Sequence, residues 1–458
     1  MALQSVNPAT GEVVATWDRM SRDEVFAVAA DVHEAFLAWR RLTVAERAPH
    51  FVALAEVLRD HAGEWGALIT AEMGKTLKEA RAEVEKCAWM AEVYAANAPE
   101  WLADETVAAD GLRHTVTHQP LGVVFSIMPW NYPFWQALRF GVPGLLAGNT
   151  SLLKHASNVT GCAFAIEKAF ALAGFPPNVF RTVVPDYATV AALIADDRIQ
   201  GVSLTGSTDV GRHVGREAGG HLKKVVLELG GSDPFIVLED ADLDFTVAGA
   251  VTGRMLTAGQ SCIASKRFIV VESVAEAFAA RFAARMGALK VGDPTDPATD
   301  VGALVDRRAV AELADQLAQS VAAGARVLCG GEALPGPGCF FPPTVVSGCR
   351  PGMRIVDEEV FGPIAPVIAV PDEAAAIALA NASEFGLGGS VWTADVDRGE
   401  RVARQVESGT VFVNSITKSD PRMPFGGVKN SGLGRELGRW GLLEFVNVKG
   451  LNVYRHGG

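Results

Sequence analysis

Residues 121–130 read LGVVFSIMPW, a short and continuous apolar run that ends in Pro and Trp. A run of this length is typical of a strand that is buried on both faces of a sheet. Three similar runs follow along the chain: TSLLK (150–154), GVSLTG (201–206) and KKVVLELGG (223–231). Helical stretches at 158–174 and 207–219 separate them, and such alternation builds a parallel sheet from βαβ units. The sequence therefore predicts an α/β fold with a dinucleotide-type domain in this region.

The region before residue 112 has a helical pattern. Apolar residues recur every three or four positions, which is the spacing of one face of a helix. Ser21 and Glu24 form a capping box for the first helix. Two longer helices are expected at 44–63 and 66–98.

A second alternation of helices and strands follows the fourth apolar run. We expect helices at 247–259, 275–288 and 307–323, and strands at 266–273, 389–395 and 410–415. They predict a second α/β lobe of about 200 residues, with a ligand cleft between the two lobes. Two segments of alternating polarity, 112–118 and 448–454, predict exposed edge strands that need a partner chain.

Composition and charge exclude several classes of protein. The 458 residues are 49% hydrophobic, as in globular chains, and 41 basic against 53 acidic residues give a net charge of −12. This balance argues against a nucleic-acid partner or an anionic membrane surface. The six cysteines are scattered, so we expect neither disulfides nor a metal site. No run approaches the ~20 apolar residues of a membrane span, and the N-terminus lacks a signal-peptide pattern, so we expect a cytoplasmic protein.

Three residues have the chemistry of a nucleophilic site. Cys262 lies in AGQSCIASKR, where small neighbours leave its sulfur accessible, although a buried and inert cysteine fits the same pattern. Glu228 lies in the apolar run VVLELGG, where lost solvation raises the pKa of a carboxylate toward that of a general base; a Glu paired with an Arg is the alternative. Asn131, in the rigid loop PWNYP, can direct its amide at a developing oxyanion, or it is an ordinary turn residue.

Further positions suit a phosphate group. Gly206 and Ser207 in TGSTDVG lie between a strand and a helix, where free N–H groups and the helix dipole favour an anion. The motif matches neither of the usual glycine-rich fingerprints, so an ordinary turn is the alternative. Lys154, at the end of a strand, is placed to meet a phosphate or a ribose, unless it is simply solvated.

Seven blocks, in order along the chain, resemble the aldehyde dehydrogenase superfamily. They are PWNYP (129–133), LLKHASN (152–158), SLTGSTDVG (203–211), LELGGSDP (227–234), GQSC (259–262), EEVFGPI (358–364) and PFGGVKNSGLGRELG (424–438). The resemblance extends over nearly the whole chain. It implies that Cys262 is the nucleophile, Asn131 the oxyanion-hole amide and Glu228 the general base.

The resemblance also implies a cofactor site and an architecture. Its cofactor-lining positions are Trp130, Lys154, Gly206, Ser207, Glu359 and Phe361. The expected fold is a Rossmann-like cofactor domain (1–111 and 121–230), an α/β catalytic domain (231–435) and a bridging β-ribbon (112–120 and 436–458). In the family this ribbon pairs subunits, so a homodimer or homotetramer is expected.

The implied reaction is the oxidation of an aldehyde by NAD or NADP. The Cys262 thiolate attacks the aldehyde carbon to give a thiohemiacetal, hydride transfer leaves a thioester, and Glu228 activates the water that releases the acid. Relatives that prefer NAD often carry a Glu at the position of Ser157, so we predict NADP, with NAD possible if Ser157 is neutral.

Three residues bear on the substrate. Arg139 matches an Arg of the family members that oxidise succinate semialdehyde, and its guanidinium would hold the substrate carboxylate; a structural Arg that bridges elements is the alternative. Ser419 would help to hold the carboxylate, and Trp135 would form an apolar wall. We therefore predict oxidation of succinate semialdehyde to succinate. A broader aliphatic or semialdehyde dehydrogenase and a catalytically silent relative are the alternatives.

Overall fold

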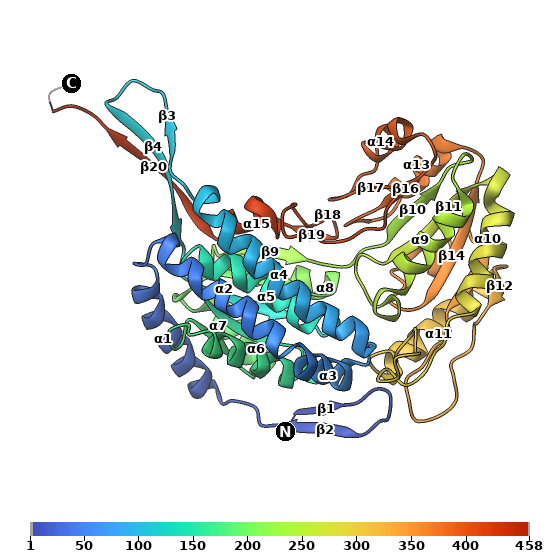
Figure 1. The fold of residues 1–458 in the computed structure, drawn as a ribbon, viewed down its shortest axis with the longest axis horizontal. Coiled ribbons are helices and arrows are strands. Elements are labelled where there is room, and N and C mark those ends of the chain that lie inside the picture. Colours follow the sequence, from blue (N-terminus) through green and yellow to red (C-terminus); the bar gives the residue numbers. More distant parts are fainter. Residues whose placement is uncertain (1–2, 457–458) are drawn as a thin grey trace.

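The computed structural model describes residues 3–456, and its first lobe is built on a six-stranded sheet (Figure 1). The sheet order is β19-β9-β8-β5-β6-β7, and all neighbours are parallel except β19. The strands are β5 (Val123–Met128), β6 (Thr150–His155), β7 (Phe180–Thr182), β8 (Ile199–Thr205), β9 (Lys224–Glu228) and β19 (Gly432–Leu433). The four apolar runs of the sequence are thus strands of a parallel sheet, which confirms the predicted α/β fold.

This strand order creates a point where the chain direction across the sheet reverses. From β5 the chain moves outward through β6 and β7, and then returns to the other side of β5 through β8 and β9. In open α/β sheets, ligands bind beyond the carboxyl ends of the strands at such a switch point. The loop after β5 begins at Pro129 and the loop after β8 begins at Gly206, so both lie at this position.

Helices cover both faces of the first sheet. They are α1 (Arg22–Trp39), α2 (Val44–Asp60), α3 (Ala62–Met73), α4 (Leu77–Trp101), α5 (Pro133–Leu146), the 3-10 turn η1 (Ser157–Val159), α6 (Thr160–Leu172), α7 (Tyr187–Ala195) and α8 (Thr208–Gly220). The predicted capping box of Ser21 and Glu24 is confirmed. The single helix expected over 66–98 is wrong, because Gly74 takes a left-handed φ of 88° and Thr76 starts a new capping box.

The second lobe holds a seven-stranded sheet of order β12-β13-β14-β11-β10-β16-β17, parallel except for β12. Its strands are β10 (Asp233–Val237), β11 (Ser265–Val271), β12 (Arg326–Cys329), β13 (Thr344–Ser347), β14 (Ile364–Val370), β16 (Ser390–Trp392) and β17 (Phe412–Val413). Its helices are α9 (Leu243–Met255), the 3-10 turn η2 (Leu256–Gly259), α10 (Glu272–Gly287), α11 (Arg307–Ala322), α12 (Arg354–Asp357), α13 (Glu373–Asn381) and α14 (Val396–Ala403). The helix expected over 247–259 therefore ends early, in a tight turn.

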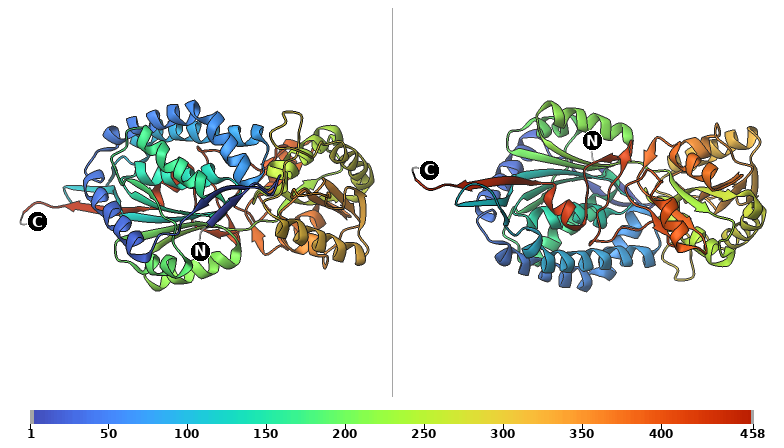
Figure 2. Two further views of the ribbon diagram at one scale, coloured as in Figure 1. Left: turned by 90° about the horizontal axis from the view of Figure 1, so that it is seen from below. Right: turned by 90° about the horizontal axis from the view of Figure 1, so that it is seen from above.

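A three-stranded antiparallel ribbon projects from the first lobe, and both views of Figure 2 show it clear of the body. It consists of β3 (Glu105–Val107), β4 (Arg113–Pro120) and β20 (Val446–Val453). The short helix α15 (Gly438–Leu443) precedes β20 in the chain. The two segments expected as edge strands thus pair with each other, from Val446 opposite Pro120 to Val453 opposite Arg113. Two small antiparallel strand pairs complete the fold: β1 (Leu3–Val6) with β2 (Val13–Trp17), and β15 (Phe385–Gly386) with β18 (Val428–Lys429).

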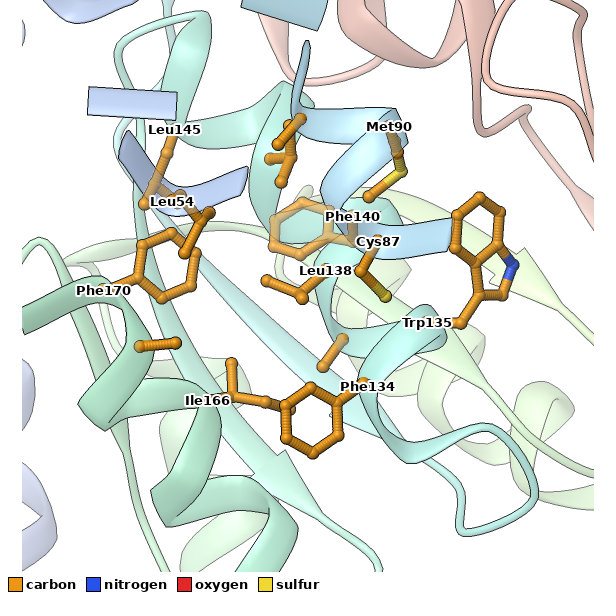
Figure 3. Close-up of a cluster of buried hydrophobic side chains, with 14 of the residues drawn as sticks. Leu54, Cys87, Met90, Phe134, Trp135, Leu138, Phe140, Leu145, Ile166 and Phe170 are labelled. Carbon is orange, nitrogen blue, oxygen red and sulfur yellow. The ribbon is translucent and has the colours of Figure 1, made fainter. Parts of the chain in front are cut away.

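The largest hydrophobic core lies between the helices of the first lobe (Figure 3). Leu54 of α2, Cys87 of α4, Leu138 of α5 and Ile166 of α6 meet there with no solvent exposure. Trp135 stands at the margin of this cluster in Figure 3. The core therefore fixes α4 and α5, the two helices that carry the side chains of the site described below. No described helix is both long and apolar enough to cross a membrane.

Replacing Leu54 with Ala should lower the free energy of unfolding by about 2–5 kcal/mol, because it leaves a cavity in this core. Val52, on the same helix α2, is 46% exposed, so Val52→Ala is the matched control and should change stability little. Urea denaturation measures both. Equal effects of the two substitutions would contradict this assignment of the core.

Candidate active site

A tight turn presents Cys262 between the end of α9 and the start of β11. In η2 (Leu256–Gly259) the residues Thr257 and Ala258 have φ of 52° and 55°, values that residues with a side chain rarely adopt. The chain reverses there, and Cys262 follows partly exposed. Cys262 thus differs from the four buried cysteines of the described chain.

Two buried cations hold this turn and loop. The Lys266 ammonium donates to the carbonyl oxygens of Ser261 at 2.8 Å and Cys262 at 2.7 Å. The Arg254 guanidinium donates to the Ser265 carbonyl at 2.9 Å. Hydrogen bonds from charged donors are stronger than neutral ones, so the backbone around the sulfur is held firmly.

Two cavities meet at Cys262. The larger has a volume of about 420 Å³ and the smaller about 240 Å³, and both are lined by Cys262 and by Gln136 of α5. Cys262 therefore borders two ligand spaces at once. This arrangement suits a nucleophile whose substrate enters from one side and whose redox partner enters from the other.

The larger cavity lies at the switch point of the first sheet. Its lining includes Trp130, Gly206, Ser207, Glu359 and Phe361. The Trp130 and Phe361 rings meet edge to face with centroids 5.8 Å apart. A Cβ built on Gly206 would have no protein atom within 4 Å, so the backbone there is open to the cavity. Ser207 caps α8 and accepts from the Val210 N–H, which leaves the start of this helix facing the cavity.

Lys154 and Ser157 lie elsewhere, in a small separate hollow at the end of β6. Arg19 and Tyr187 share this hollow, and the Lys154 ammonium is 5.9 Å from the centre of the Tyr187 ring. Burial and the nearby Arg19 lower the pKa of Lys154. Two cations that face one hollow without a carboxylate in its lining are suited to a phosphate.

The Asn131 amide joins the loop after β5 to the cysteine loop. Its Nδ2 donates to the Gln260 carbonyl at 2.9 Å, and its Oδ1 accepts from Gln136 at 3.0 Å. These bonds fix which face of the amide carries the donors, and the second N–H of Nδ2 remains for a ligand oxygen. Asn131 lines the larger cavity, as does Cys262.

The Glu228 carboxylate is buried at the end of β9 but lines neither cavity. Among the described residues neither of its oxygens has a hydrogen-bond partner. It faces Gly426, where an added Cβ would lie 2.6 Å from Oε1. Burial and the neighbouring Glu436 raise the pKa of Glu228 to about 8.

Burial also raises the pKa of the Cys262 thiol to about 12, although Arg139 and Lys266 oppose the shift. The thiol is therefore protonated in the free protein at neutral pH. It must lose this proton to become a nucleophile, and the nearby Arg139 and Lys266 favour that loss while Glu228 opposes it.

The smaller cavity has a mainly apolar wall with charged groups at its margin. Trp135, Arg139 and Ser419, all expected at the substrate site, line it, and so does Phe425. Arg139 is buried, forms an ion pair with Glu436 and lies 4.7 Å from the centre of the Phe425 ring. Its guanidinium is thus already compensated by a carboxylate of the chain.

Three residues of the site were missed in the sequence analysis. Gln136 lies in the NYPFWQALR stretch and Glu436 in GRELG, both within or beside quoted motifs, and their polar side chains in apolar surroundings were the available signal. Lys86 of α4 lines the smaller cavity, and nothing local marks it among the many charged residues of that helix.

The chain is similar to known proteins over its full length. The profile of the Aldehyde dehydrogenase family matches residues 1–451. A Synechocystis protein, named "Probable succinate-semialdehyde dehydrogenase (NADP(+))", is 49% identical over 98% of this chain and 99% of its own. A Mycobacterium tuberculosis protein, "Succinate-semialdehyde dehydrogenase (NADP(+)) 1", is 47% identical over 98% of this chain and 99% of its own.

A solved structure agrees with these relatives. The succinic semialdehyde dehydrogenase of Streptococcus pyogenes, in complex with NADP+ as the cofactor, superposes with a TM-score of 0.97 at 36% identity and covers 99% of this chain and 100% of its own. The family profile, the relatives and the fold all agree with a cysteine that lines two cavities. The chain belongs to the aldehyde dehydrogenase family.

Proposed function

We propose that this protein oxidises succinate semialdehyde to succinate with NADP. The observation that carries the proposal is the position of Cys262, which lines both the cavity at the switch point and the smaller, mainly apolar cavity. The names of the relatives from Synechocystis and Mycobacterium tuberculosis support the same substrate and cofactor.

The first step is the addition of the Cys262 sulfur to the aldehyde carbon. The thiol gives up its proton to solvent water, and the carbonyl oxygen becomes an oxyanion as the C–S bond forms. The Asn131 side chain has one N–H to donate to that oxygen, since the other is held by Gln260. One preorganised donor of this kind stabilises a transition state by about 3–4 kcal/mol.

NADP supplies a hydride acceptor when it is bound. The residues present fit such a cofactor: Gly206 leaves its backbone open, Ser207 starts α8, and Trp130 and Phe361 offer aromatic walls. We propose that Glu359, whose carboxylate accepts from the Gly231 N–H at 3.1 Å, holds the ribose next to the nicotinamide. In the hollow beside β6, Lys154 and Ser157 would hold the other ribose and its 2′-phosphate.

Glu228 releases the product from the cysteine. A carboxylate with a pKa of about 8 is a good match for the deprotonation of water near neutral pH. Because Glu228 lies behind the cavities, its side chain turns toward the thioester to activate the water.

The smaller cavity binds the chain of the substrate. We propose that Trp135 packs against the methylene groups and that Arg139 and Ser419 contribute donors toward the carboxylate. The pairing of Arg139 with Glu436 limits how much net charge this Arg adds.

We also propose a homodimer or homotetramer built through the ribbon. Val448 and Leu451 of β20 are 60% and 41% exposed, and β20 leaves one edge unpaired within the described chain. In this scheme residues 1–111 and 121–230 form the cofactor domain, 231–435 the catalytic domain, and 112–120 with 436–458 the oligomerisation segments.

A panel of aldehydes with each cofactor tests the proposed reaction through the absorbance of the reduced nicotinamide. With NADP, kcat/KM for succinate semialdehyde should exceed that for butanal, its uncharged analogue, by roughly 10- to 100-fold, the range of a charge-assisted hydrogen bond. Equal values would indicate a broader aldehyde dehydrogenase. Cofactor binding without reduction by any aldehyde would indicate a silent relative.

Glu228→Gln should separate acylation from hydrolysis. We expect a burst of NADPH up to one equivalent of enzyme, followed by turnover slowed by roughly 100-fold or more, because the thioester loses its base. In the natural enzyme the hydrolytic rate should rise as pH increases through about 8, where Glu228 loses its proton, and the variant should lack this rise. Stopped-flow absorbance measures both phases, and wild-type turnover in the variant would exclude Glu228 as the base.

Ser157→Glu should shift cofactor preference toward NAD. Ser157 is exposed in η1, so the fold tolerates the change, while the new carboxylate repels a 2′-phosphate and can accept from a ribose hydroxyl. We expect the NADP/NAD ratio of kcat/KM to fall by roughly 10-fold or more. Ser157→Ala, which adds no charge, is the matched control; an unchanged ratio in the Glu variant would refute the role of this position.

A further inference from the structure

The smaller cavity contains a lysine that forms no ion pair with a carboxylate of the described residues. Lys86 of α4 lies in its wall, and its ammonium is 4.1 Å from the centre of the Trp135 ring. The ammonium donates to the Ser419 hydroxyl at 2.7 Å, and within residues 3–456 this is its one hydrogen-bond partner. Two of its three N–H groups are therefore free for a ligand.

The acidic neighbours of Lys86 are already occupied. Glu83 is ion-paired with Lys75 at 2.6 Å, and Asp420 is ion-paired with Arg422 at 2.7 Å. Lys86 itself takes part in no ion pair among the described residues. A partly buried ammonium without a counter-ion costs free energy, which a bound anion would recover.

The other cations of the cavity are less suited to hold an anion. Arg139 is neutralised by Glu436, and the buried Glu228 adds a second carboxylate to its surroundings. Lys418 also lines the cavity but is exposed, where water and salt screen its charge. Lys86 alone combines partial burial, an unpaired charge and a fixed position.

Lys86 also lies in the cavity that a substrate bound at Cys262 would fill. Lys86, Trp135 and Ser419 line only the smaller cavity, whereas Cys262 lies where the two cavities meet. An aldehyde group at Cys262 thus places the remainder of the molecule in the space that these three residues border.

We propose that Lys86, together with Ser419, is the residue that selects for a carboxylate at the far end of the aldehyde. The inference rests on the proposed function and assigns the net positive charge to Lys86 rather than to Arg139. The Trp135 ring packs against the ammonium and orients it. The Ser419 hydroxyl accepts from Lys86 and donates its own proton to the carboxylate.

The test compares kcat/KM for succinate semialdehyde and for butanal in four variants: Lys86→Met, Lys86→Arg, Lys78→Met and Lys418→Met. Lys86→Met should lower the ratio of the two values by roughly 10- to 100-fold, chiefly through KM for succinate semialdehyde, while butanal oxidation stays intact and reports a folded enzyme. Lys86→Arg should restore most of the preference. Lys78→Met, an exposed lysine on the same helix, is the matched control and should behave as wild type.

The pH dependence of the same ratio gives a readout that a purely structural lysine would not move. Burial lowers the pKa of Lys86 to about 8. The titratable and charged groups that face it are Glu83 and Cys87 on α4, Arg139 on α5 and Asp420 in the loop between β17 and β18. The preference for the charged aldehyde should decline as pH rises through about 8, and Lys86→Arg should keep it to higher pH.

The outcomes separate the two proposals. If wild type prefers succinate semialdehyde and Lys86→Met does so equally, the assignment of Lys86 is overturned while the proposed function stands. Loss of the preference in Lys418→Met instead would also overturn it. If wild type shows no preference over butanal, the proposed function fails and this inference fails with it.

Discussion

The chemistry of this protein depends on a backbone turn that buried cations hold in place. Thr257 and Ala258 adopt left-handed φ values, which cost free energy unless the surroundings compensate. Lys266 and Arg254 provide that compensation through bonds to carbonyl oxygens of the loop and of β11. The result is a sulfur atom held between two cavities by groups that belong to the second lobe. The first lobe then needs only to bring Asn131 and the helix α5 against it.

A second constraint is the balance of buried charge behind the sulfur. Glu228, Glu436 and Arg139 share one apolar region, so two carboxylates compete for a single guanidinium. Burial raises the pKa of both acids, Glu436 adds to the shift of Glu228, and Arg139 opposes both shifts, which gives Glu228 a proton affinity suited to base catalysis. The ion pair with Glu436 also compensates the charge of Arg139. Recognition of an anionic substrate is therefore left to Lys86 of α4.

Much of the fold and part of the site follow from local sequence pattern. The runs at 121–130 and 223–231 are apolar throughout because both faces of their strands are covered, and this composition was sufficient to predict a parallel sheet. Cys262, Asn131 and Glu228 stand in short motifs whose residue types suit nucleophilic chemistry. Lys86, which escaped prediction, acts at long range. Lys86 and Ser419 are separated by 333 positions, and no local signal reports that their side chains meet.

The return of the chain to its first lobe has a consequence for biosynthesis. β19 joins the edge of the first sheet beside β9. The Tyr94 hydroxyl donates to the Gly438 carbonyl, and Glu436 forms an ion pair with Arg139. The last segment therefore completes a lobe whose other elements lie hundreds of residues earlier in the chain. A ribosome-bound nascent chain that lacks this segment exposes the edge of β9 and leaves Arg139 without its counter-ion. Competence for catalysis is therefore acquired only once this segment has been made and docked, and termination before it yields an aggregation-prone fragment rather than a weakened enzyme.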